Sequence, residues 1–225
     1  MSRTLLSVRD MTIKHSRKVL YCGLDLDINE GDCIMLCGAN GSGKTTFLKS
    51  LAAISDEIAM IPARILKVKG FTLREFISLS CFKFGGIGRR TSEQEEKVID
   101  NALETFSLSH LASRDISTLS DGEFQKGAIA VAIARQSQII LLDEPTAFLD
   151  AENRASVLKT IKGLCDTENG PHRRPAVIFS THDLHDGLEV ASRVMALGAD
   201  GKIYFGSTEE GNMENAVKRI FSSER

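Results

Sequence analysis

The chain has 225 residues, of which 42% are hydrophobic, which suffices for one domain with a buried core. Its formal charge of −2 and pI near 6.2 lack the basic excess of a general nucleic-acid-binding protein. The sequence shows neither a signal-peptide pattern nor 18 uninterrupted apolar residues, so any membrane role is expected to act through a partner. Five cysteines without a disulfide pattern indicate an intracellular protein.

The beginning of the chain predicts a small antiparallel sheet. Residues 5–8 and 11–13, and then residues 19–28, alternate apolar and polar side chains, which is typical of half-buried strands. A turn is predicted at 29–32, which reads Asn-Glu-Gly-Asp. The continuous apolar run at 34–37 then predicts a fully buried strand.

A glycine-rich loop follows this buried strand. Residues 38–45 read Gly-Ala-Asn-Gly-Ser-Gly-Lys-Thr, and residues 44–53 show helical periodicity. Between a strand and a helix, such glycines let backbone N–H groups turn toward phosphate, and the helix N-terminus favours an anion. Lys44 is expected to reach the β- and γ-phosphates and Thr45 to ligate Mg²⁺, the simpler alternative being a glycine-rich turn with a surface lysine. The predicted nucleotide-binding residues of this region are Gly38, Asn40, Gly41, Ser42, Gly43, Lys44, Thr45 and Thr46.

The segment 70–119 has a different character and predicts a helical insertion. Thr72 with Glu75 has the spacing of a capping box, and so has Ser92 with Glu95. Apolar residues then recur with helical spacing over 98–106.

Further core strands follow the insertion. Apolar runs at 139–142, 176–179 and 194–197 predict buried strands, with a polar helix at about 151–165 and a surface loop at 168–175. The first run ends in two carboxylates. Next to a phosphate loop, Asp143 is expected to hold Mg²⁺ from its outer coordination shell, and Glu144 to activate or orient the attacking water. Without that loop, Asp143 would be interpreted as a turn residue before Pro145.

Two more motifs complete the set. Residues 119–123 read Leu-Ser-Asp-Gly-Glu, and residues 180–183 read Ser-Thr-His-Asp. Together with the phosphate loop and the acidic strand end, they resemble, over nearly the whole chain, the nucleotide-binding domain of ABC transporter ATPases. In this resemblance, residues 119–123 match the family signature Leu-Ser-Gly-Gly-Gln, residues 147–150 the D-loop and residues 180–183 the switch-histidine segment.

The resemblance implies an α/β fold, namely a P-loop NTPase of the ABC type with a small antiparallel N-terminal sheet and a helical subdomain carrying the signature. Residues 1–225 would form a single domain, with 1–69 and 125–225 in the core lobe and about 70–124 in the helical subdomain.

The resemblance also implies a homodimer that closes around ATP and Mg²⁺. Ser120 and the N–H of Gly122 would contact the γ-phosphate held by the opposite chain, Asp150 would help join the two sites, and His182 would sense the γ-phosphate. The catalytic residues would then be Glu144, His182 and Lys44. Two simpler interpretations stay open, with Ser120 as an ordinary helix cap and His182 as an ordinary strand-end histidine.

The chain departs from the family pattern in four places. Asp121 and Glu123 replace the first glycine and the final glutamine of the signature, which predicts weaker ATP-driven closure unless their side chains point away from phosphate. His15 best matches the aromatic residue that stacks on adenine, and it offers a smaller face. Ala63 follows the strand at 58–62 where the family has a glutamine that touches Mg²⁺ and relays to the membrane partner. The short stretch from Lys44 to Ser120 predicts that a strand pair has been lost or shortened.

The implied function is ATP hydrolysis by an ABC transporter subunit bound to integral-membrane permease subunits, on the cytoplasmic face of the cell membrane. Residues 71–76 and 85–90 resemble importers of the iron–siderophore, haem or cobalamin type, which would connect the chain to a substrate-binding protein through the permease. A coupling helix of the permease would enter the groove between Ala63 and Leu79. A non-transport ABC-type ATPase and a weakly active regulatory ATP-binding module are the alternatives, and nucleic acid is not an expected partner.

Overall fold

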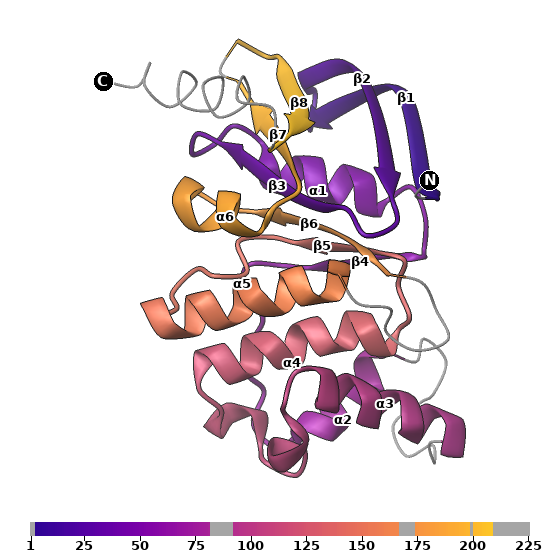
Figure 1. Ribbon diagram of the computed structural model, residues 1–225, viewed down its shortest axis with the longest axis vertical. Coiled ribbons are helices and arrows are strands. Elements are labelled where there is room, and N and C mark those ends of the chain that lie inside the picture. Colours follow the sequence, from indigo (N-terminus) through magenta and orange to yellow (C-terminus); the bar gives the residue numbers. More distant parts are fainter. Residues whose placement is uncertain (1–2, 82–91, 167–173, 199, 209–225) are drawn as a thin grey trace.

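The computed structural model describes residues 3–81, 92–166, 174–198 and 200–208. Its first two strands, β1 (Thr4–His15) and β2 (Lys18–Asn29), form an antiparallel sheet of their own (Figure 1). Their register runs from Thr4 opposite Asn29 to His15 opposite Lys18. This pairing confirms the small antiparallel sheet predicted for the beginning of the chain.

The larger sheet contains six strands among the described residues, in the order β4-β5-β6-β3-β7-β8. All neighbouring pairs are parallel except β7 and β8. Because helices or the small sheet cover both faces, most of its strands are apolar throughout. The strands are β3 (Cys33–Gly38), β4 (Ile58–Ile61), β5 (Ile139–Leu142), β6 (Ala176–Ser180), β7 (Arg193–Leu197) and β8 (Ile203–Ser207).

Alternate residues of each strand contribute to two separate core layers. On β3, Ile34 and Leu36 pack in the layer formed with α1 (Lys44–Ala52) and the small sheet. The alternating residues Cys33, Met35 and Cys37 pack on the opposite face, against the other helices. This division follows from the two-residue period of a strand.

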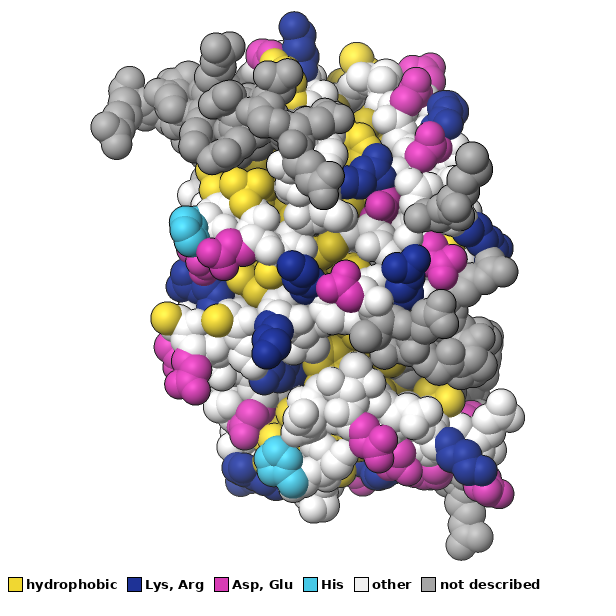
Figure 2. Space-filling model, viewed as in Figure 1, with side chains coloured by type: hydrophobic (Ala, Val, Ile, Leu, Met, Phe, Trp, Pro, Cys, Tyr) yellow, Lys and Arg dark blue, Asp and Glu magenta, His cyan; other side chains and the backbone are white. Residues whose placement is uncertain are grey.

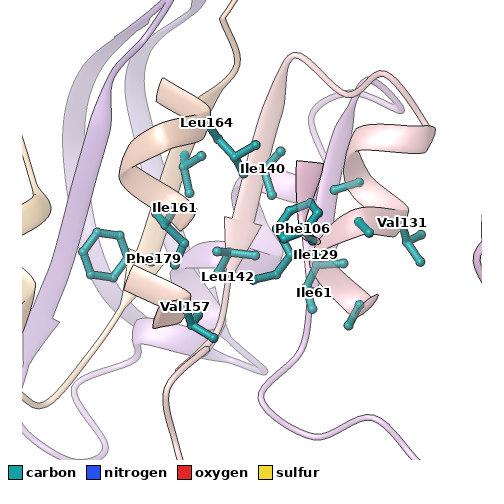
Figure 3. Close-up of a cluster of buried hydrophobic side chains, with 14 of the residues drawn as sticks. Ile61, Phe106, Ile129, Val131, Ile140, Leu142, Val157, Ile161, Leu164 and Phe179 are labelled. Atoms are coloured by element: carbon teal, nitrogen blue, oxygen red, sulfur yellow. The ribbon is translucent and has the colours of Figure 1, made fainter. Parts of the chain in front are cut away.

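The helices of the second face lie at successive distances from the sheet. Figure 1 shows α5 (Ala151–Asp166) beside the sheet, α4 (Asp121–Ala134) beyond α5, and α2 (Leu73–Cys81) and α3 (Glu93–Thr105) beyond α4. Helix α4 also contacts the edge strand β4. The short helix α6 (Leu184–Val190) follows β6 and contacts β3. Figure 3 shows the core between α5 and the sheet, formed by Val157, Ile161, Leu164, Ile140, Leu142 and Phe179.

The predicted helical insertion contains α2 and α3, followed by two short 3-10 helices, η1 (Ser109–Leu111) and η2 (Ile116–Thr118). Both predicted capping boxes are present. The Thr72 N–H donates to the Glu75 carboxylate at 2.8 Å. In the second box, the Ser92 N–H donates to the Glu95 carboxylate, and the Glu95 N–H donates to the Ser92 hydroxyl. The glycine-rich stretch 85–90 and most of the expected loop at 168–175 lie outside the described residues.

The chain passes from α1 to β4 through residues 53–57 without forming a further strand. This short connection agrees with the predicted loss of a strand pair. Within the part of the chain that the structure describes, no helix combines the length and the apolar character needed to cross a bilayer. On the face drawn in Figure 2, described Lys and Arg side chains alternate with Asp and Glu side chains.

Candidate functional site

The glycine-rich loop joins the end of β3 to the start of α1, in the context that its sequence predicts. Gly43 is the N-cap of α1 and has a φ of 100°, a left-handed conformation that favours glycine. A Cβ atom at Gly43 would lie 2.8 Å from Cδ1 of Leu20 on β2, so a larger residue here would also have to displace that side chain. Gly41 has a φ of 78°. Left-handed residues in such a loop help to create a concavity of N–H groups that binds anions.

The side chain of Lys44 is folded back onto this loop. Its Nζ donates to the carbonyl oxygens of Gly38 at 2.8 Å and Ala39 at 3.2 Å, and the residue is buried. The ammonium group is therefore held at the point where the loop begins, within reach of whatever anion the loop binds.

The next two residues of α1 connect the loop with distant parts of the chain. The Thr45 hydroxyl donates to the Asp143 carboxylate at 2.7 Å, which brings the two predicted Mg²⁺-binding residues together. Oγ1 of Thr46 lies 3.4 Å from Nδ1 of the exposed His15, so the predicted adenine-side residue lies at the same loop.

The side chain of Ser42 provides an unsatisfied polar atom in the loop. Its hydroxyl oxygen is buried and makes no hydrogen bond within the described residues. Buried polar atoms are nearly always satisfied, so this hydroxyl fits a site in which a ligand supplies the missing bond. The Ser42 carbonyl oxygen accepts a hydrogen bond from the Tyr21 hydroxyl at 2.8 Å. Burial raises the pKa of Tyr21, which keeps this hydroxyl protonated as a donor.

The two acidic residues lie where β5 ends, and Ser180 at the end of the neighbouring β6 orients both of them. The Ser180 hydroxyl donates to the Asp143 carboxylate at 2.9 Å and accepts the Glu144 backbone N–H at 2.8 Å. Asp143 is buried and Glu144 is partly exposed. Glu144 also has a φ of 47°, an unusual backbone conformation for a residue other than glycine and one that is found at functional sites. One carboxylate is thus fixed beside Thr45, and the other remains accessible.

His182 lies two residues after the end of β6 and is exposed. The next residue, Asp183, caps α6 by accepting the Asp186 N–H at 3.2 Å, and its carboxylate also accepts from Arg154 of α5 at 2.9 Å. The connection that carries His182 is therefore held by contacts with two helices.

The signature residues form the N-terminus of α4. Ser120 is the N-cap and forms a complete capping box with Glu123, whose carboxylate accepts the Ser120 N–H at 2.7 Å. This hydrogen bond lowers the pKa of Glu123, with smaller contributions from nearby Arg114 and His110. The Glu123 charge is therefore engaged at the helix end.

Asp121 and Gly122 of the same turn have partners from other segments. The Asp121 carboxylate pairs with Lys67 at 2.6 Å. A Cβ atom at Gly122 would lie 2.7 Å from Cγ of Asn153. The backbone N–H of Asn153 donates a hydrogen bond to the carboxylate of Asp150 in the D-loop at 2.8 Å. A larger residue at position 122 would have to displace the Asn153 side chain, so the glycine fits the close approach of α5 to the signature turn.

Most of the predicted residues gather at one edge of the sheet, and the signature residues do not join them. The phosphate loop, His15, Asp143 and Glu144 are linked through the contacts of Thr45 and Thr46. In Figure 1, α4 lies at a different level from β3 and α1, with α5 between them. Within one chain, the signature turn is therefore separated from the phosphate loop.

Sequence reasoning did not identify three residues that support the site: Tyr21, Ser180 and Lys67. Ser180 could have been found, because the carboxyl ends of parallel strands meet at the same edge of the sheet as Asp143. Tyr21 and Lys67 act through tertiary contacts, for which the local sequence carries no signal.

The residues present fit a magnesium nucleotide. The loop offers backbone donors, an ammonium group and an unsatisfied hydroxyl, all suited to phosphate oxygens. Thr45 and Asp143 offer hydroxyl and carboxylate oxygens, which are the ligand types that Mg²⁺ prefers.

The comparisons with known proteins point to one family. A family model for ABC transporters matches residues 21–147, more than half of the chain. The achromobactin transport ATP-binding protein of Dickeya dadantii is 28% identical over 97% of this chain and 88% of its own length. An aliphatic sulfonates import ATP-binding protein of Pseudomonas syringae is 35% identical over 87% of this chain and 71% of its own.

A solved structure of an inward-facing ABC transporter, assigned to the metal-chelate type, superposes with a TM-score of 0.83. It is 26% identical and covers 96% of this chain and 88% of that chain. This likeness confirms the expected P-loop fold of the ABC type. The chain therefore belongs to the ABC transporter family of ATP-binding proteins, which hydrolyse ATP to drive transport.

Proposed function

We propose that this chain is the ATPase subunit of an importer for metal chelates of the iron–siderophore, haem or cobalamin type, and that it acts as a homodimer around ATP. One observation supports the dimer. The phosphate loop and Asp143 lie together, whereas the Ser120–Gly122 turn lies on α4, separated from them by α5. A second copy placed face to face would supply its own Ser120 and Gly122 to the nucleotide held by the first.

The contacts within one chain support a role for each residue. Lys44 would pair with the β- and γ-phosphates, and Thr45 and Asp143 would hold Mg²⁺, which neutralises phosphate charge when bound. Glu144 would take a proton from the attacking water, its backbone being held by Ser180. His182 would contact the γ-phosphate.

The membrane part of the proposal rests on the relatives and on an exposed apolar surface. Leu66, Val68 and Leu79 are 84%, 51% and 44% exposed, which fits a coupling helix of a permease on the cytoplasmic face of the membrane. The chelate class is supported by the achromobactin relative and the metal-chelate type structure, which both cover nearly the whole chain. A substrate-binding protein would connect only through the permease.

Hydrolysis by the wild-type chain should depend on its own concentration, because each site would be completed by a second copy. We expect phosphate release per chain to rise with chain concentration, and EDTA to abolish it because Thr45 and Asp143 would lose their metal. A rate per chain that stays constant down to concentrations at which light scattering detects only monomer would contradict the dimer. Hydrolysis unaffected by EDTA would contradict the proposed Mg²⁺ site.

The Ala63 position offers a test of how complete the catalytic site is. The Asp143 N–H donates to the Ile61 carbonyl at 2.9 Å, so Ala63, two residues beyond Ile61, lies near the acidic strand end. Ala63→Gln should raise ATP turnover by up to about tenfold, since it adds an amide oxygen able to orient the metal or the water. Steady-state phosphate release measures this, with Ala53→Gln as an exposed control. An unchanged rate would show that the site works without this glutamine.

A further inference from the structure

We propose that Lys67 is a positioning residue for the signature turn, because it neutralises Asp121 next to the groups that receive the nucleotide of the opposite chain. The inference rests on the proposed homodimer. It goes beyond that proposal by assigning a role to a residue outside every motif and by accounting for Asp121, where this chain departs from the family signature.

Lys67 makes three contacts with the beginning of α4. Its Nζ donates to the Leu119 carbonyl at 2.8 Å and to Asp121 Oδ1 at 2.6 Å, and it lies 5.5 Å from the centre of the Phe124 ring. The Lys67 side chain is 24% exposed, whereas that of Asp121 is 70% exposed. The lysine is thus the more enclosed partner.

The residues on either side of Lys67 reverse the usual pattern of burial. Leu66 and Val68 are 84% and 51% exposed, while the lysine between them turns toward α4. Burial of apolar surface alone favours the opposite arrangement. The segment therefore leaves two apolar side chains in solvent while its cation lies at the signature turn.

Asp121 is the charge in this turn that most needs an offset. It lies between Ser120 and Gly122, whose hydroxyl and N–H would meet the γ-phosphate, and a carboxylate there repels a triphosphate. The other added acid, Glu123, is engaged in the capping box. Lys67 supplies a positive charge and draws the Asp121 carboxylate toward the 62–70 segment.

The same segment begins at the acidic strand end of its own chain. The Ile61 carbonyl at the end of β4 accepts the Asp143 N–H, and beyond Lys67 the Gly70 N–H donates to Asp115 at 2.8 Å, shortly before α4. A short stretch of backbone thus connects the metal side of one site to the signature turn that would serve the other.

The test measures ATP-driven dimerisation in a Glu144→Gln background, where hydrolysis does not interfere. Lys67→Met keeps the aliphatic stem over Phe124 but removes the charge. We expect the ATP concentration for half-maximal dimerisation, followed by light scattering, to rise about tenfold. Lys67→Arg should leave this ATP concentration within about twofold of the value measured with Lys67 in place, because arginine can still pair with Asp121. Lys69→Met, an exposed lysine of the same segment, is the matched control.

Combination with Asp121→Gly separates positioning from a structural role. If Lys67 acts by neutralising Asp121, adding Lys67→Met to Asp121→Gly should change the midpoint less than about twofold. An equal loss in both backgrounds would mean that Lys67 acts only through Leu119 or Phe124, and would overturn the inference. No effect of Lys67→Met on a dimer that does form would also overturn it. Absence of any ATP-dependent dimer for Glu144→Gln alone would instead overturn the homodimer, and the inference with it.

Discussion

Glu144→Gln is expected to lower ATP turnover by about 10²- to 10⁴-fold while leaving ATP binding in place. The amide cannot accept a proton from water, yet it has nearly the same size and shape as the carboxylate. The hydrogen bond from residue 144 to Ser180 uses the backbone N–H, so the substitution leaves it intact. The metal-binding pair of Thr45 and Asp143 is also untouched.

With hydrolysis blocked, the ATP-bound dimer should accumulate. Size-exclusion chromatography with ATP and Mg²⁺ should show a species of twice the monomer mass, and phosphate release measures the loss of turnover. Glu152→Gln is a suitable control, because this carboxylate is exposed in the first turn of α5. A variant that stays monomeric would remove the closed-dimer mechanism, and one that hydrolyses ATP at the wild-type rate would remove the role of Glu144.

The sheet and its phosphate loop could be predicted because short-range patterns determine them. Apolar runs of strand length, such as residues 34–37 and 139–142, are typical of strands covered on both faces. Gly43 is required by its left-handed φ, and the loop pattern already contains it. The contact between Thr45 and Asp143 is a consequence of parallel strands ending at the same edge.

The contacts of irregular segments could not be predicted in the same way. Lys67 lies in a stretch without periodicity and meets Leu119 and Asp121 only after the helical segment has folded back onto it. Because such contacts are not visible in the sequence, the sequence alone predicts that Asp121 and Glu123 weaken closure unless their side chains point away from phosphate. The structure shows that one carboxylate is held by the capping box and the other by Lys67.

Lys44→Ala is the change expected to affect nucleotide binding most, with a loss of affinity of roughly 100-fold or more. The ammonium group is buried at the start of the loop, where low local polarity strengthens its attraction for phosphate. A titration with a fluorescent ATP analogue measures the affinity, and Lys49→Ala, an exposed lysine on the same helix, is the matched control.

The folded state needs a separate check, because Lys44 also satisfies two loop carbonyls. Thermal unfolding without nucleotide reports any loss of stability. Lys44→Gln keeps an N–H donor on the side chain that faces the Gly38 carbonyl while removing the charge. If both variants fold and both lose affinity, the charge itself binds the phosphates. If both bind the analogue as tightly as the wild type, the backbone N–H groups and the helix N-terminus hold the triphosphate by themselves. Lys44 would then be a structural residue of the loop.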